Sequence, residues 1–215
     1  MSAKKQKKAN IAVLISGGGT NLQAILDAEK SGALHSGSVR LVISNRKGAY
    51  GLERAKAAGV KAVAVTKKDC GSQEAFEAEL IRRLDEAKTD LIVLAGWLAI
   101  LSENFTRHFE HRIINIHPAL IPSFCGEGFY GLKVHEAALV KGVKVSGATV
   151  HYVNEIPDGG EIIAQKAVRV YPGDTPEKLQ LRIMKQAEWK LLPKAAEDIC
   201  AKIIAGDHPG FQEAR

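Results

Sequence analysis

The chain of 215 residues has few cysteines, few aromatic side chains and no long apolar run. Cys70, Cys125 and Cys200 lack the spacing of a metal site or a disulfide framework, which favours reduced thiols in a cytoplasmic protein. Aromatic residues make up 6%, which is thin for platforms that stack nucleic-acid bases. No apolar stretch approaches the ~20 residues of a membrane-spanning helix. We therefore expect a cytoplasmic protein that binds no membrane, no nucleic acid and no metal.

Positive charge is concentrated at the start of the chain. The formal net charge is +6, but four lysines lie within the opening stretch MSAKKQKK. Without them the charge is about +2, which suits small anionic substrates better than a polyanion. We expect a disordered basic tail over residues 1–9, a single domain over residues 10–206 and a second tail over residues 207–215.

Short apolar runs that alternate with helical patterns predict the fold class of the first half. The runs are rich in β-branched residues and nearly continuous in hydrophobicity, as parallel strands covered on both faces are. Glycines follow two of the helical patterns where a helix would end, and Ser72 is placed as an N-cap. This order favours an α/β fold with a doubly wound, mostly parallel, Rossmann-like sheet. The predicted strands are residues 11–16, 39–45, 61–66, 90–96 and 112–117.

The second half changes to longer alternating segments. Residues 145–155 and 160–171 lie on either side of the turn-rich IPDGG and predict an antiparallel strand pair. A long C-terminal helix is predicted from a cap at Thr175 to about Gly206, kinked or divided at Pro193. No linker separates the two halves, so we expect them to share one sheet.

The first candidate site is the Gly-rich segment LISGGGTNLQA, which follows the first strand. Glycines there allow a sharp turn, and the exposed amides at the start of the next helix favour a phosphate. The segment lacks the third glycine of the dinucleotide fingerprint and the lysine of a Walker motif, so a monophosphate is favoured over NAD or ATP. Taken alone, these residues fit two interpretations equally well: a phosphate site, or an ordinary turn in which Thr20 or Asn21 caps the helix.

The second candidate site combines NIHP, at the end of a strand, with a distant NEIPDGG. Asn115 and His117 are two residues apart, so they share one face at the carboxyl end of the strand, where ligands gather in open α/β sheets. An amide beside an imidazole suits charge that develops on a carbonyl oxygen. Asp158 is placed to reach His117 and to raise its pKa. The alternatives are a strand-end histidine bonded to a backbone carbonyl and an ordinary Asp-Gly-Gly turn.

Five segments, in this order, resemble the formyltransferase family: LISGGGTNLQAIL, VLAGWLAIL, NIHPALIPSF, SGATVHYVNEIPDGGEIIAQ and PGDTPEKL. The resemblance extends from about residue 10 to about residue 195. It implies transfer of the formyl group of 10-formyltetrahydrofolate to the glycyl amine of 5-phosphoribosylglycinamide in purine biosynthesis. It also implies a phosphate-binding half over residues 10–111 and a catalytic, folate-binding half over residues 112–206. Both a monomer and a homodimer are compatible with it.

Residue roles follow from the same resemblance. It implies that Asn115, His117 and Asp158 are catalytic, with His117 kept protonated by Asp158. Taken alone, Trp97 fits a core aromatic better than a ligand contact. The implied contacts with the phosphoribosyl substrate are Gly19, Thr20, Asn21 and Glu188, and those with the folate are Gln73, Trp97, Leu98, Ala99, Ile100, Leu101 and Asn115.

Three other functions compete with this one. A formyltetrahydrofolate deformylase would use water with the same three catalytic residues, but that family carries an extra regulatory domain. A methionyl-tRNA formyltransferase would need a further C-terminal domain for tRNA. A non-catalytic nucleotide-binding module, or an NAD enzyme, would explain the Gly-rich turn but would leave Asn115, His117 and Asp158 without a shared role. The loop CGEGFYG, residues 125–131, is either a flap over the site or an inert surface excursion.

Overall fold

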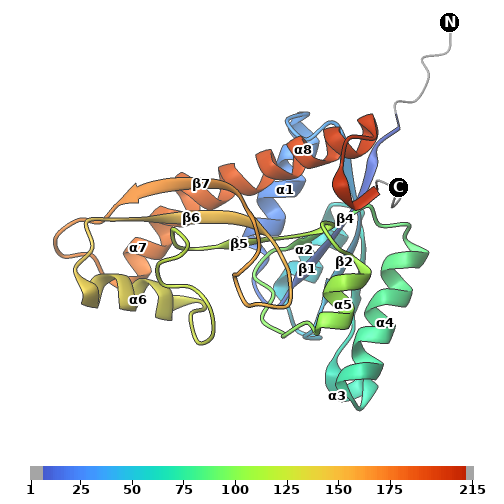
Figure 1. The fold of residues 1–215 in the computed structure, drawn as a ribbon, viewed down its shortest axis with the longest axis horizontal. Coiled ribbons are helices and arrows are strands. Elements are labelled where there is room, and N and C mark those ends of the chain that lie inside the picture. The colour runs from blue at the N-terminus through green and yellow to red at the C-terminus, as the bar shows by residue number, and fades with distance from the viewer. Residues whose placement is uncertain (1–6, 212–215) are drawn as a thin grey trace, which may run out of the picture.

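A seven-stranded mixed sheet forms the centre of the computed structural model, which describes residues 7–211 (Figure 1). The strand order is β3-β2-β1-β4-β5-β6-β7. Pairing is parallel from β3 to β5 and antiparallel from β5 through β6 to β7, which confirms the predicted fold class. The strands are β1 (Ala9–Ile15), β2 (Gly37–Ser44), β3 (Lys61–Ala64), β4 (Leu91–Leu94), β5 (Ile113–His117), β6 (Val145–Tyr152) and β7 (Ile162–Arg169).

Helices cover both faces of the sheet (Figure 1). On one side α8 runs across the strands beside α1, while α4 and α5 lie on the other side (Figure 1). Within residues 7–211, no helix is long and apolar enough to cross a membrane. The helices are α1 (Thr20–Ser31), α2 (Tyr50–Ala57), α3 (Lys67–Cys70), α4 (Gln73–Glu86), α5 (Glu103–His108), α6 (Leu132–Lys141), α7 (Pro176–Ile183), the π-helix η1 (Met184–Glu188), α8 (Trp189–Ala205) and the 3-10 helix η2 (Pro209–Phe211).

The two helical layers explain why the strands are apolar throughout. Successive side chains of a strand point to opposite faces, and both faces of β1 are covered. Ile11 and Val13 belong to the core shared with α1 and α8, while Ala12 and Leu14 belong to the core shared with α4 and α5. All four are completely buried. A polar residue at any of these positions would be buried away from water. Polar and apolar residues therefore do not alternate along this strand.

The C-terminal helix is divided at a different place from the predicted one. Pro193 lies inside α8, and the irregular turn is the π-helix before it. Burial continues through this turn, because Ala187 and Glu188 are both buried between Ile183 of α7 and Leu192 of α8. A π turn takes up one extra residue and so changes which side chains face the sheet. Pro193 therefore does not divide the helix, and a kink at this residue stays a prediction.

The predicted tails fall largely at the limits of the described residues. Residues 1–6 and 212–215 lie outside them. The first strand already begins at Ala9, inside the tail predicted over residues 1–9, and η2 lies inside the tail predicted over residues 207–215.

Candidate active site

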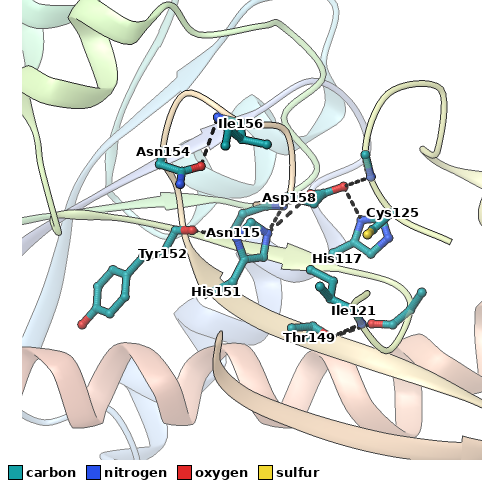
Figure 2. A network of polar contacts seen from close by, with 12 residues as sticks. Asn115, His117, Ile121, Cys125, Thr149, His151, Tyr152, Asn154, Ile156 and Asp158 are labelled. Carbon is teal, nitrogen blue, oxygen red and sulfur yellow. Dashed lines mark hydrogen bonds and ion pairs between the residues drawn. The ribbon is translucent and has the colours of Figure 1, made fainter. Parts of the chain in front are cut away.

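The carboxylate of Asp158 is the centre of a cluster of polar side chains at the carboxyl end of β5 (Figure 2). Its Oδ2 lies 3.3 Å from Nδ1 of His117, and its Oδ1 lies 3.5 Å from the side-chain nitrogen of Asn115. The structure therefore brings together the three residues that the sequence predicted to converge. Asn115 and His117 come from β5, whereas Asp158 comes from the loop that follows β6 (Figure 2).

His151 is a fourth member of this cluster, and no role was assigned to it from the sequence. Strand β6 pairs with β5 in a register that sets His151 directly opposite Asn115. Its Nε2 lies 3.2 Å from the side-chain nitrogen of Asn115 and 3.4 Å from Oδ1 of Asp158. The period-two pattern of β6 predicted a strand that brings His151 near the site, but pairing register cannot be read from one sequence, so its contact with Asn115 was not predicted.

Hydrogen bonding fixes how Asn115 and His151 share their protons. Nδ1 of His151 lies 2.7 Å from the carbonyl oxygen of Tyr152, which only accepts, so Nδ1 carries the hydrogen in the neutral ring. Nε2 of the neutral ring therefore accepts from the amide of Asn115, whereas Nε2 of the protonated ring donates to Oδ1 of Asp158. Asn115 directs its second amide hydrogen toward Asp158 at the long distance given above. Both donors of Asn115 thus point into one small region of the site.

Two opposing effects act on the pKa of His117. Its Nε2 lies 2.8 Å from the carbonyl oxygen of Phe124, so acceptors face both ring nitrogens and the protonated ring would be satisfied on both sides. The ring is also only 4% exposed. Burial lowers the pKa of His117, and it outweighs the opposite effects of the Asp158 charge and the Phe124 carbonyl. Asp158 does raise the pKa of His117, as predicted, but burial lowers that pKa by more, so the prediction that Asp158 keeps His117 protonated was wrong.

Asp158 is held in its ionised form. Burial alone would raise the pKa of Asp158, but hydrogen bonding from His151, the positive charge on His117 and the Gly126 amide lower it overall. The Gly126 N–H donates to Oδ2 at 2.9 Å. The backbone of Asp158 is left-handed, with φ of 55°, a conformation that aspartate adopts more readily than most residues. Asp158 is thus a fixed negative charge that touches two imidazoles.

Cys125 lies in the same region without the properties of a nucleophile. Burial and the negative charge of Asp158 raise the pKa of its thiol, which disfavours the reactive thiolate. Its Sγ donates to the carbonyl of Pro122 instead. Among residues 7–211, no group of three or more His, Cys, Asp or Glu side chains is arranged to hold a metal ion.

A cavity of about 460 Å³ opens beside the cluster. Asn115, His151 and Asp158 lie on one side of it, and residues 97–101, here called the wall segment, lie on another. A larger cavity of about 820 Å³ lies between α1 and α8, but it contains none of these polar residues, so we place the chemistry in the smaller one. Its lining residues are Arg46, Leu94, Trp97, Leu98, Ala99, Ile100, Leu101, Asn115, Gly126, Phe129, Tyr130, His151, Val153, Asn154, Glu155, Ile156, Pro157 and Asp158.

The wall segment presents apolar side chains to this cavity. Leu98 and Ile100 are 48% and 81% exposed, which is high for such residues and gives the cavity an apolar surface. Trp97 is buried and stacks on Phe76, with ring centroids 6.2 Å apart and planes at 7°, so most of this residue belongs to the core. Gln73 does not line the cavity. Its amide nitrogen instead donates to the carbonyl of Ile100 at 3.1 Å.

The Gly-rich turn leads directly into α1. Gly19 is the N-cap with φ of 70°, and a Cβ atom there would lie 2.7 Å from the Cα of Gly51. No side chain caps α1, so its first amides remain available for an anion. A cavity of about 490 Å³ lies beside Gly17 and Gly18, and Arg46 lines both this cavity and the one next to Asn115.

Glu188 reaches this turn from the C-terminal π-helix. Its Oε2 accepts a hydrogen bond of 2.7 Å from the side-chain nitrogen of Asn21, and both residues are buried. Burial raises the pKa of Glu188 to about 7, with the hydrogen bond from Asn21 opposing the shift. Two residues that the sequence assigned to the same substrate are therefore neighbours. Thr20 is half-buried at the start of α1.

Comparisons with known proteins show what this chain is similar to. The family model described as formyl transferase matches residues 9–196. The phosphoribosylglycinamide formyltransferase of Escherichia coli (strain K12) is 42% identical over 177 residues, which cover 82% of this chain and 81% of that protein. Among solved structures, glycinamide ribonucleotide transformylase 1 from Symbiobacterium toebii has a TM-score of 0.85 and 42% identity, and the match covers 92% of this chain and 93% of that one.

Some relatives are much longer than this chain. The trifunctional purine biosynthetic protein adenosine-3 of Drosophila melanogaster is 45% identical over 186 residues. Those residues cover 86% of this chain but only 13% of the Drosophila protein. The similarity thus concerns one region of that relative.

Proposed function

Because this chain belongs to the formyl transferase family, we propose that it transfers the formyl group of 10-formyltetrahydrofolate to the glycyl amine of 5-phosphoribosylglycinamide. The products are N-formyl-glycinamide ribonucleotide and tetrahydrofolate, in purine biosynthesis. The observation that carries the proposal is the convergence of Asn115, His117 and Asp158 beside a cavity with an apolar wall. We place the activity in the cytoplasm, because all three cysteines are unpaired.

The cavity suits a folate. A flat heterocycle requires apolar surface on its faces and a few hydrogen-bonding groups at its edges. Leu98 and Ile100 supply the apolar surface. The wall segment has no regular secondary structure, so its main chain supplies the hydrogen-bonding groups. When bound there, 10-formyltetrahydrofolate supplies the activated formyl group as a co-substrate. We assign no folate contact to the side chain of Gln73, because it is directed to Glu77 and Ile100.

The Gly-rich turn suits the phosphate of the other substrate. The uncapped amides at the start of α1 and the positive end of the helix dipole favour a dianion. Arg46 adds a positive charge between this turn and the cavity beside Asn115. Asn21 and Glu188 offer hydrogen-bonding groups for the ribose or the phosphate, with the carboxyl close to half-protonated at neutral pH.

The catalytic roles follow from the charges in the cluster. Asn115 donates to the formyl oxygen as negative charge develops there. Burial lowers the pKa of His117, so the ring is neutral at pH 7. We assign to it the transfer of the proton from the attacking amine to N10 of the folate, as the bond between N10 and the formyl carbon breaks. The Asp158 carboxylate and the Phe124 carbonyl then stabilise the imidazolium from both sides. Holding both substrates in one orientation contributes several kcal/mol, up to ~7–11 in favourable cases.

An assay that separates transfer from hydrolysis tests this proposal. The purified chain is mixed with 10-formyltetrahydrofolate, with and without 5-phosphoribosylglycinamide, and tetrahydrofolate formation is followed by absorbance. We expect turnover only with both substrates and a loss of about 10²-fold or more in His117→Ala. His108→Ala is the control, because His108 is an exposed residue that contacts Asp85 and Phe109, neither of which lines the cavity. Release of formate at the same rate without 5-phosphoribosylglycinamide would instead identify a hydrolase.

A further inference from the structure

The wall segment of the cavity is held by side chains rather than by secondary structure. Residues 97–101 belong to no helix or strand, although they follow β4 and precede α5. At one end, the N–H of Leu98 donates to Oγ of Ser16 at 2.8 Å. At the other end, the N–H of Ser102 donates to Oε1 of Glu77 at 2.7 Å. The shape of this wall therefore depends on two anchors, Ser16 directly after β1 and Glu77 of α4.

Glu77 makes most of the contacts at the second anchor. Besides the Ser102 N–H, its carboxylate accepts from the Ser102 hydroxyl and from the side-chain nitrogen of Gln73 at 2.7 Å. The same Gln73 nitrogen reaches the Ile100 carbonyl. Glu77 thus holds the end of the wall segment both directly and through Gln73. Ser102 is also the N-cap of α5, so this anchor fixes where the wall segment ends.

The position of Glu77 on α4 is unusual for a carboxylate. It lies on the buried stripe of the helix with Leu80 and Leu84 and is only 6% exposed. An apolar residue would suit the core better, because a buried carboxylate is costly unless hydrogen bonds satisfy it. All of the bonds that satisfy Glu77 come from the segment that follows β4 or from Gln73, which also contacts that segment.

We propose that Glu77 is a positioning residue for the folate: by bonding to Ser102 and Gln73, it fixes the wall segment against which the heterocycle binds. Glu77 does not line the cavity and touches no reacting atom. Its effect is to hold Leu98 and Ile100, and the main chain between them, in one geometry. The identity of the ligand rests on the proposed function, whereas the anchoring contacts do not.

Binding of tetrahydrofolate, measured by calorimetry, tests the role of Glu77. Glu77→Gln keeps the size of the side chain but replaces one acceptor by a donor that faces Ser102. We expect its Kd for tetrahydrofolate and its KM for 10-formyltetrahydrofolate to rise about tenfold or more, the loss typical of a hydrogen bond to a charged group. The KM for 5-phosphoribosylglycinamide should stay within about twofold, because that substrate is placed at the Gly-rich turn.

Glu79→Gln is the matched control. Glu79 lies on the same helix but pairs at the surface with Arg82 and Arg83. We expect parental values for the tetrahydrofolate Kd and for both KM values. Glu77→Ala is a further variant, which removes the carboxylate altogether. If it does not fold, Glu77→Gln and Ser102→Ala still decide whether Glu77 positions the wall segment. Ser102→Ala retains the N–H bond to Glu77 and should weaken folate binding less than Glu77→Gln does.

The possible outcomes separate this inference from the proposed function. A Glu77→Gln protein that melts at a lower temperature but binds tetrahydrofolate like the parent would show a role in stability alone and would overturn the inference. A parent that binds tetrahydrofolate without transferring formyl would contradict the proposed function, while the Kd series would still decide the role of Glu77. A parent that binds no tetrahydrofolate would overturn both.

Discussion

Glu188 accepts a hydrogen bond of 2.7 Å from Asn21, although 167 positions separate these residues in the sequence. The contact joins the π-helix before α8 to the first turn of α1. It places a buried carboxyl group beside the Gly-rich turn. Since burial raises the pKa of Glu188 to about 7, the charge of this contact changes within the physiological pH range.

The first prediction concerns stability as a function of pH. Glu188 has a pKa of about 7 in the folded chain and an ordinary value of 4.5 when unfolded, so between these pH values the folded state binds more protons. Its contribution to the free energy of unfolding is therefore fully present below pH 4.5 and falls by about 3 kcal/mol as the pH rises to 7. Glu188→Gln removes this titration and keeps an acceptor for Asn21.

Urea denaturation of both proteins at several pH values between 4.5 and 8 measures the effect. The difference in unfolding free energy between Glu188→Gln and the parent should grow in favour of the variant as the pH rises to 7, and then level off. Comparing two proteins cancels the opposite contributions of histidines such as His135, whose pKa burial lowers to about 4. A difference that is constant with pH would contradict the buried, proton-binding carboxyl.

The second prediction concerns the turn into α1. Gly19→Ala places a methyl group 2.7 Å from the Cα of Gly51 and in a left-handed conformation, so either the turn or α2 must move. We expect the free energy of unfolding to fall by about 1–3 kcal/mol. Gly17→Ala is the control, because a Cβ there meets nothing within 4 Å and its φ is not positive. Equal stability of the two variants in urea denaturation would show that Gly19 is not required for this turn.

The third prediction concerns the interaction of Asp158 with His117. The negative charge of Asp158 raises the pKa of His117 against the larger effect of burial, so its removal should lower that pKa further. In Asp158→Asn the acid limb of kcat/KM should therefore move to lower pH, while the maximum falls because the imidazolium loses its partner. Asparagine tolerates the left-handed backbone at this position, so the loop should keep its path.

A surface His–Asp pair provides the control for this profile. His108 and Asp85 lie 3.5 Å apart and are about half exposed, so Asp85→Asn should leave both limbs of the pH profile unchanged. An acid limb that stays in place in Asp158→Asn would mean that His117 is not the group that loses its proton. A limb that moves to higher pH would contradict the sign of the Asp158 effect.

The fourth prediction concerns the donor to the formyl oxygen. Asn115→Ala should lower kcat by about 10²-fold or more, as removal of a preorganised oxyanion donor does. The KM values should change less, because the interaction develops mainly as charge builds up on the oxygen. Asn104→Ala, on the exposed face of α5, is expected to behave like the parent in steady-state kinetics. Full activity of Asn115→Ala would show that Asn115 is not the donor to the formyl oxygen.

Local sequence patterns predicted the helices and strands better than they predicted which of these elements lie next to one another. The cap at Ser72 and the apolar stripe of α4 agree with the structure, because helix start signals and side-chain periodicity act within one or two turns. The pairing of β6 with β5, and with it the place of His151, could not be predicted. The position of the π turn could not be predicted from apolar spacing, because one of the two buried residues in that turn is the polar Glu188.

The amino-acid sequence by itself determined the class of sheet, the Gly-rich entry to α1 and the choice of Asn115, His117 and Asp158 as a cluster. These features depend on residue type and short-range spacing, which a single chain displays directly. Only the tertiary structure decided that burial lowers the pKa of His117, that burial raises the pKa of Glu188 to about 7 and that Gln73 is directed to Glu77 and Ile100. Protonation depends on how completely water is excluded, and hydrogen-bond partners depend on register and loop path, so both are set by distant segments that meet only on folding.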